Sequence, residues 1–172
     1  MHFTIGTTWD GTPIVPAAQI QLEAWLDASG LHLRVDAPYY SDPPPPGPAG
    51  PTPGLWDYEV VEFFLLGADG QHYTEIEVSP HGHHLVLCLR GVRTPSAVGL
   101  PLDYVAVIEG DRWVGRATLA PQHLPEGPYR ANACAIHGPA GRRRYLSAVP
   151  LGGEQPDFHR LEAFPVAHLV RD

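Results

Sequence analysis

The sequence contains no lysine. All eleven basic residues are arginine, and nineteen acidic residues give a net charge of -8 when histidine is neutral. Without lysine, the chain cannot use a lysine Schiff base or a lysine general base. The excess of negative charge argues against a nucleic-acid partner, because phosphate contacts need a basic surface.

Export and membrane signals are also missing. The first eleven residues, MHFTIGTTWDG, have neither a basic start nor an apolar segment of signal-peptide length. No apolar run approaches the length of a membrane span. These absences predict a cytoplasmic protein with no membrane contact. The eighteen glycines and twenty prolines, together with abundant alanine, indicate a GC-rich bacterial genome.

Motifs for nucleophilic, nucleotide and zinc chemistry are absent. The sequence has no GxSxG, Walker or GxGxxG loop, and no HExxH. The two cysteines, Cys88 and Cys134, each lie within an apolar run. We expect both to be buried free thiols rather than a disulfide.

What the sequence does contain is a series of short segments in which apolar and polar residues alternate. The clearest two are residues 19–26 and 31–37, on either side of the turn Ala28-Ser29-Gly30. A period of two indicates a strand with one buried face, so this pair predicts a hairpin. About ten such strands, at a spacing of roughly 8–12 residues and without an amphipathic helix, predict an all-β fold. We expect one antiparallel, jelly-roll-like β-sandwich domain over residues 1–172.

One segment, residues 38–54, interrupts this pattern with eight of the twenty prolines. Proline removes a backbone donor, so the segment cannot be a helix or a central strand. We predict a long loop with polyproline character. Loops of this length are usually functional or mobile.

Four glutamates occupy positions where core residues are expected. Glu59 and Glu62 lie inside one apolar run, and Glu75 and Glu77 lie inside the next. A buried ionised carboxylate is costly unless it is paired or bound. If the two strands pair, Glu62, Glu75 and Glu77 could line one face. The alternative is an exposed face that pairs with arginine or histidine across the strands.

Ten histidines raise the question of a metal site. Three of them, His81, His83 and His84, follow a turn, but neighbouring residues of a strand point to opposite faces. We expect no cofactor, while a divalent metal stays open, with His81 and His159 as the candidate ligands.

Several long segments resemble an uncharacterised protein family that has a human chromosome 4 open reading frame member. They are LWDYEVVEFFL, YTEIEVSPHGHHLVLCL, AIHG with Tyr145 downstream, QPDFHRLEAF, TTWDGTP and PYYSDPPPP. The resemblance covers most of the chain. The family brings no established activity with it.

The order of the motifs also resembles, more distantly, the β-sandwich of family 9 carbohydrate-binding modules and DOMON-like domains. In sugar-binding members, an aromatic platform and an acid about six residues later contact the sugar. Trp56 and Glu62 have this spacing here. The second stacking tryptophan expected late in the chain is absent, and Tyr145 is the nearest candidate.

Three hypotheses follow. The first is a non-catalytic β-sandwich that binds a carbohydrate-like small molecule, with a site composed of Trp56, Glu62, Glu75, Glu77, His137 and Tyr145. The second is a hydrolase or isomerase in which Glu62 or Glu75 works with His81, His137 or His159, with or without a metal. The third is an interaction module that uses the proline-rich loop or an exposed edge strand, including contacts between copies of the chain. The sequence leaves the choice open, because strand register decides whether the glutamates converge.

Overall fold

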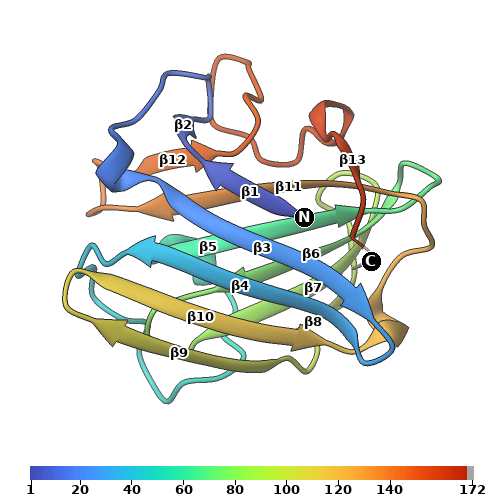
Figure 1. Cartoon of the computed structure of the whole chain (residues 1–172), viewed down its shortest axis with the longest axis horizontal. Helices are drawn as coiled ribbons and strands as arrows, with labels where there is room; N and C mark the ends of the chain where they lie inside the picture. Colours follow the sequence, from blue (N-terminus) through green and yellow to red (C-terminus); the bar gives the residue numbers. More distant parts are fainter. Residues whose placement is uncertain (170–172) are drawn as a thin grey trace.

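The computed structural model describes residues 1–169, in which the regular elements are strands and short 3-10 turns arranged as two sheets (Figure 1). The five-stranded sheet has the order β1 (His2–Ile5), β3 (Ile20–Asp27), β4 (Gly30–Pro38), β10 (Arg112–Leu119) and β9 (Asp103–Glu109). The eight-stranded sheet has the order β2 (Thr7–Thr8), β12 (Arg144–Ser147), β11 (Tyr129–His137), β5 (Val60–Leu66), β6 (His72–Val78), β7 (His84–Arg90) and β8 (Pro95–Val98), and β13 (Val166–Ala167) pairs with β11.

Every pairing between these strands is antiparallel, which confirms the predicted fold class. The predicted hairpin is β3–β4, with Asp27 opposite Gly30. Gly30 has a φ of 133°, and a Cβ there would lie 2.0 Å from the carbonyl oxygen of Leu119. This turn therefore requires glycine.

The space between the two sheets is filled by the alternate residues of each strand. On β5 these are Val61, Phe63 and Leu65, all at most 2% exposed. Phe63 meets Phe3 of the other sheet edge-to-face, with ring centroids 5.6 Å apart. Each such side chain contributes about 1.5–3 kcal/mol by leaving water.

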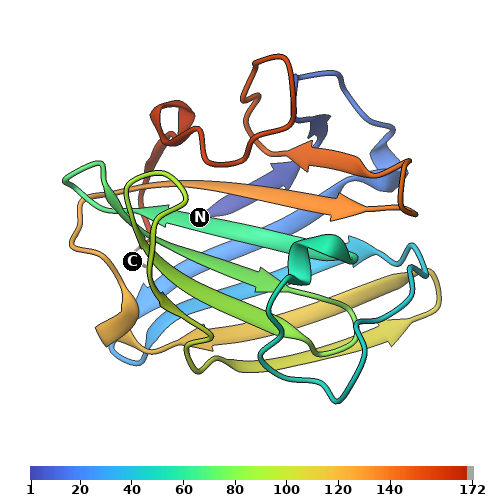
Figure 2. The ribbon, with the colours of Figure 1, turned by 180° about the vertical axis from the view of Figure 1, so that it is seen from behind.

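The outer face of the eight-stranded sheet is buried as well. Residues of opposite parity on β5, such as Val60, Phe64 and Leu66, belong to a second apolar cluster that includes Leu151, Phe158, Leu161 and Phe164 from the C-terminal segment. Figure 2, which shows this face, has η2 (Leu55–Asp57) in front of the strands. The sheet is therefore covered on both sides, and polar residues on its outer face are enclosed.

The proline-rich segment contains neither a strand nor a helix between residues 39 and 54, apart from one bridge at Pro51, as expected. It is fastened to the sandwich at both ends. The carboxylate of Glu59 accepts hydrogen bonds from the backbone N–H of Tyr40 (3.1 Å) and Asp42 (3.4 Å). Near the other end, the N–H of Thr52 donates to the carbonyl of His84 at 2.8 Å. Within residues 1–169, no helix has the length and apolar character needed to cross a membrane.

Candidate functional site

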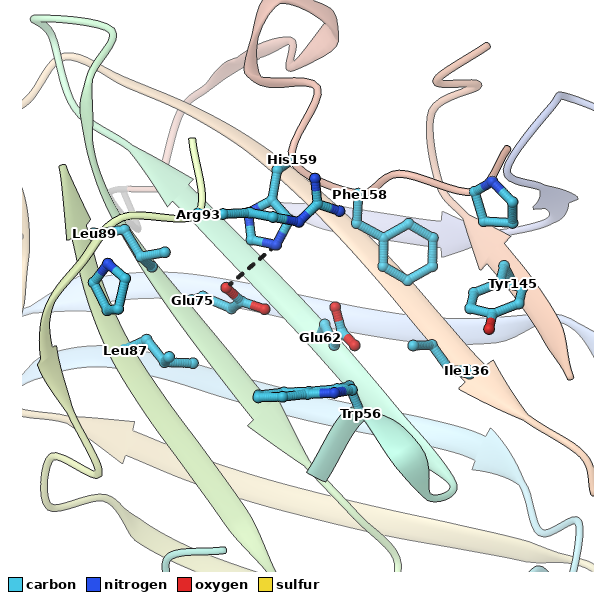
Figure 3. Close-up of a pocket in the computed structure, with 12 residues that line it drawn as sticks. Trp56, Glu62, Glu75, Leu87, Leu89, Arg93, Ile136, Tyr145, Phe158 and His159 are labelled. Carbon is cyan, nitrogen blue, oxygen red and sulfur yellow. Dashed lines mark ion pairs between the residues drawn. The ribbon is translucent and has the colours of Figure 1, made fainter. Parts of the chain in front are cut away.

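A cavity of about 450 Å³ opens on the outer face of the eight-stranded sheet (Figure 3). It is lined by Trp56, Glu62, Glu75, Leu87, Leu89, Arg93, Pro95, Ile136, Tyr145, Pro156, Phe158 and His159. The strands supply the floor, and η2 and the loops supply the walls. The volume is that of a small-molecule site.

Trp56 forms one wall of this cavity from the middle of η2. The turn begins at Gly54, whose φ of 78° favours glycine, and the N–H of Asp57 donates to the Gly54 carbonyl at 3.0 Å. The guanidinium of Arg143, in the loop before β12, donates to the carbonyl of Trp56 at 3.0 Å and ties the η2 turn to that loop. The Trp56 side chain nevertheless stays 47% exposed, which is unusual for tryptophan in a folded chain.

The floor carries two carboxyl groups because of strand register. Glu62 of β5 lies directly opposite Glu77 of β6, and Glu75 lies opposite Phe64, so all three glutamates share the outer face. Glu62 is 3% exposed, Glu75 6% and Glu77 0%. The structure therefore brings together Glu62 and Glu75 with Trp56 in one cavity.

Burial sets the protonation of these groups. It raises the pKa of Glu62 well above its usual range, and the charge of Glu75 adds to this effect. Burial also raises the pKa of Glu75, which the guanidinium of Arg93 partly opposes. Raised carboxyl pKa values in a cavity are a common mark of binding and catalytic sites.

Glu77 shares the face but does not line the cavity. Neither carboxyl oxygen has a hydrogen-bond partner of ordinary geometry among the described residues. Burial, followed by the charges of Glu62, Glu75 and Asp57, raises the pKa of Glu77, and the backbone N–H of Trp56 opposes this only weakly. Glu77 is thus a neutral acid at neutral pH on the outer face of the sheet, next to Glu62 and the η2 turn.

His159 joins the site from the C-terminal segment. Its Nε2 lies 4.0 Å from Oε2 of Glu75, and its Nδ1 lies 2.7 Å from the hydroxyl of Tyr73. Burial and the nearby charge of Arg93 lower the pKa of His159 to about 4. The imidazole is therefore neutral at neutral pH and cannot balance the charge of Glu75.

Arg93 and Phe158 line the cavity but were not predicted from the sequence. Arg93 lies in a turn with a φ of 53° and pairs with Asp157 at 2.9 Å. Phe158 packs edge-to-face on Tyr145, with centroids 6.1 Å apart. Neither residue lies on a strand, so no alternation marks it.

Two predicted binding residues do not line the cavity: Glu77, which shares its face, and His137, which lies in another part of the molecule. The ring of His137 stacks on Tyr40 with centroids 3.5 Å apart, next to Trp113 at the end of the space between the sheets. It has the same parity as Ala133 and Ala135, which face the five-stranded sheet. The structure therefore does not bring His137 to the cavity.

The two candidate metal ligands are not grouped with other ligands. His81 lies beside Tyr39, with 3.4 Å between Nε2 and the tyrosine hydroxyl, whereas His159 lies in the cavity. In the described part of the chain, no three His, Cys, Asp or Glu side chains are arranged to hold a metal ion. Cys88 and Cys134 are free, as predicted, but only Cys134 is buried; Cys88 is half-buried, so the prediction that both are buried was wrong for Cys88.

The fold resembles that of solved carbohydrate-binding proteins. A Bacteroides uniformis protein whose name proposes carbohydrate binding superposes with a TM-score of 0.73 at 14% identity, covering 95% of this chain and 84% of that one. A family 9 carbohydrate-binding module from Caldicellulosiruptor kristjanssonii, solved with cellotriose, superposes with a TM-score of 0.50 at 13% identity, covering 76% of this chain and 65% of that one. At these identities the likeness establishes the fold.

Sequence comparison identifies closer relatives. No protein-family model matches the chain. Proteins named UPF0462 protein C4orf33 or its homologue are 43% identical in zebrafish, 40% in mouse and 38% in human, each over 95% of this chain and 86–89% of the relative. These relatives are vertebrate, so the prediction of a bacterial source from composition was wrong. Alanine, glycine and proline content follows base composition, which is not specific to bacteria. The chain belongs to the uncharacterised UPF0462 family, as the resemblance of its motifs indicated.

Proposed function

We propose that this protein is a non-catalytic ligand-binding β-sandwich whose cavity takes a carbohydrate-like small molecule. The observation that carries the proposal is the half-exposed indole of Trp56 beside two buried carboxyl groups, Glu62 and Glu75. An aromatic face suits the apolar side of a sugar ring. Carboxyl groups suit its hydroxyls, because a protonated carboxyl both donates and accepts hydrogen bonds.

The surroundings of these three residues favour a ring-shaped polar ligand. Leu87, Leu89 and Ile136 give apolar contact area around the carboxyl groups, and Tyr145 lies across the cavity from Leu89 (Figure 3). A mostly apolar cavity with a few polar groups is the usual form of a small-molecule site. The names of the two structural neighbours, one of them solved with cellotriose, support the same ligand class.

Titration calorimetry with cellotriose, other neutral oligosaccharides and amino-sugar oligosaccharides tests the proposal. Trp56→Ala should weaken the binding of a detected sugar by roughly 5- to 150-fold, if stacking on the indole contributes as much as the roughly 1–3 kcal/mol of a base stacked on an aromatic ring. The melting temperature should change little, because half of the side chain is already exposed.

A matched control removes an indole from the opposite side of the molecule. Trp25→Ala takes away a ring that stacks on His32 of the five-stranded sheet, 5.0 Å away. This variant should bind sugar as the wild type does. Equal loss of binding in both variants, or no sugar binding at all by the wild type, would refute the proposal.

A second candidate function is hydrolysis or isomerisation in the same cavity. One observation favours it: Glu62 and Glu75 both have raised pKa values, and the neutral imidazole of His159 lies 4.0 Å from the Glu75 carboxyl. One carboxyl could donate a proton while its partner or His159 accepts one. Turnover of a bound sugar that disappears in Glu75→Gln, with binding retained, would replace the first candidate by this one.

A further inference from the structure

We infer that the ligand of this cavity carries a protonated amine, and that an amino sugar is its class. This inference rests on the proposed function above and deepens it. Its starting point is an excess of acidic side chains over unpaired basic side chains around the cavity. Its second support is a pair of buried polar groups without partners that point into the cavity.

The acidic groups around the cavity outnumber the available cations. Glu62 and Glu75 face the cavity, and Glu77 and Asp57 lie next to them. The first two are more than nine-tenths buried, and neither makes a hydrogen bond to another described residue; the one contact is the long 4.0 Å approach of His159 to Glu75. Such groups are costly to keep without a partner.

The two arginines nearby are already engaged. Arg93 pairs with Asp157 at 2.9 Å. Arg143 donates to three backbone carbonyls, those of Gly138, Trp56 and Tyr58, at 3.0, 3.0 and 2.6 Å. Neither guanidinium forms an ion pair with Glu62 or Glu75, so both floor carboxyl groups are left without an arginine partner that a cationic ligand could replace.

An organic cation suits the shape better than a metal ion does. Figure 3 shows the Trp56 indole edge-on, with the carboxyl groups of Glu62 and Glu75 on the same side of its plane. A cation over an indole face gains attraction from the ring quadrupole, more so where water is excluded. Phe158 and Ile136 add apolar walls that would contact carbon atoms of a ligand.

In this geometry, binding of an amine is coupled to the release of protons from the cavity acids. A bound ammonium favours the ionised form of the acids beside it, so acids that are protonated in the empty cavity release protons on binding. The ionisable side chains in and around this volume come from every surrounding element. Those that line it are Glu62, Glu75, Arg93, Tyr145 and His159. Asp57, Tyr73, Glu77, Cys134, Arg143 and Asp157 do not line it but interact with these residues or with one another.

The test compares three matched trisaccharides by calorimetry at about pH 6.5, where an amine beside electronegative groups is protonated. They are cellotriose, the glucosamine trimer and the N-acetylglucosamine trimer, with cyclohexylamine as a cation without a sugar. All solutions contain EDTA, so that no divalent ion occupies the cavity. Each titration is repeated in two buffers of different ionisation enthalpy, because proton release makes the observed heat depend on the buffer.

The glucosamine trimer should bind at least about tenfold more tightly than its N-acetylated counterpart, with a buffer-dependent heat. Glu62→Gln should remove most of this preference, and Glu75→Gln provides a second variant if the first fails to fold. Glu109→Gln, an exposed change on the five-stranded sheet, is the control that should leave the preference intact.

The outcomes separate the two claims. Equal affinity for the neutral and the amino trimers would overturn the amine inference and leave the sugar proposal standing. Binding of cyclohexylamine but of no sugar would support the missing cation and overturn the sugar proposal. No binding by any of the four probes would overturn both.

Discussion

The outer faces of the two sheets handle charge in opposite ways. On the five-stranded sheet, Asp36 accepts from both Nε and Nη2 of Arg112, at 2.8 and 2.7 Å, and Glu23 lies opposite Arg34 in register. On the eight-stranded sheet, Glu62 lies directly opposite Glu77, a second acid. Opposite charges facing each other stabilise a sheet, whereas two facing acids would destabilise it if both ionised, and Glu77 is protonated at neutral pH.

This difference indicates which face is built for a ligand. Paired and solvated charges, such as Asp36 and Arg112, need no further partner. Enclosed acids such as Glu62 and Glu75, which line the cavity, make the empty protein less stable, so their presence is better explained by something they bind. Substitutions on the outer face of each sheet test this contrast, beginning with the apolar cluster that encloses the acids.

The largest expected effect comes from Phe64→Ala. Phe64 is fully buried on the outer face of β5 and packs on Phe164, with centroids 5.8 Å apart. Truncating it should lower the free energy of unfolding by about 3–5 kcal/mol, as expected of a core phenylalanine. Urea unfolding monitored by circular dichroism gives the value.

Val107→Ala is the matched change on the outer face of the five-stranded sheet. Val107 is 52% exposed, so its truncation should cost less than about 0.5 kcal/mol. If Phe64→Ala cost as little, the outer face of the eight-stranded sheet would not be a second core, and the enclosure of the acids would lose its basis.

An intermediate effect is expected from Glu77→Gln and should depend on pH. The folded state holds the Glu77 proton more tightly than the unfolded state does, because burial raises the pKa above the usual 4.5. The unfolded chain therefore binds fewer protons, and stability falls as pH rises above 4.5. Glutamine carries no charge, so the variant should be more stable than the wild type at pH 8, by about 1–3 kcal/mol, and nearly equal at pH 5.

Other titratable groups also make the stability of both proteins depend on pH. The pKa values of His137 and His159 are lowered to about 4, so both histidines make stability rise with pH up to about pH 6.5. Glu59, with a pKa raised to about 7, adds to the fall. These groups are common to both proteins, so the stability curves of the wild type and of Glu77→Gln should separate progressively as pH rises above 4.5. Parallel curves from pH 5 to 8 would show that Glu77 does not titrate as expected.

The sequence predicts the strands and the shared face of the glutamates for one reason. Period-two alternation assigns parity within a strand, so Glu75 and Glu77 had to share a face. Parity also places His137 on the same face as Ala133 and Ala135, which lies between the two sheets. Applied to this strand, the same rule would have excluded His137 from the predicted site. Register, which places Glu62 opposite Glu77, depends on the whole sheet and is absent from local pattern.

Alternation along a strand cannot predict the residues that form the walls of the cavity. Arg93, Phe158 and His159 come from loops in which no period indicates direction. Trp56 was correctly singled out, yet only the structure gives its exposure, because a tryptophan beside an apolar run is usually buried. Loop placement depends on contacts distant in sequence, as with Tyr73 and His159, 86 residues apart.

The smallest expected effect of removing a charge concerns the outer face of the five-stranded sheet, where charges are paired. Asp36→Asn removes the negative charge that Arg112 contacts. The two side chains are well exposed, at 33% for Asp36 and 40% for Arg112. Water and salt screen such pairs, so the loss in free energy of unfolding should be about 0.2–1 kcal/mol and should shrink in high salt. Ligand affinity should not change, since this pair lies on the opposite sheet from the cavity. A loss above about 2 kcal/mol, or a changed affinity, would mean that charge on this face also has a specific task, and the contrast between the faces would no longer point to the cavity.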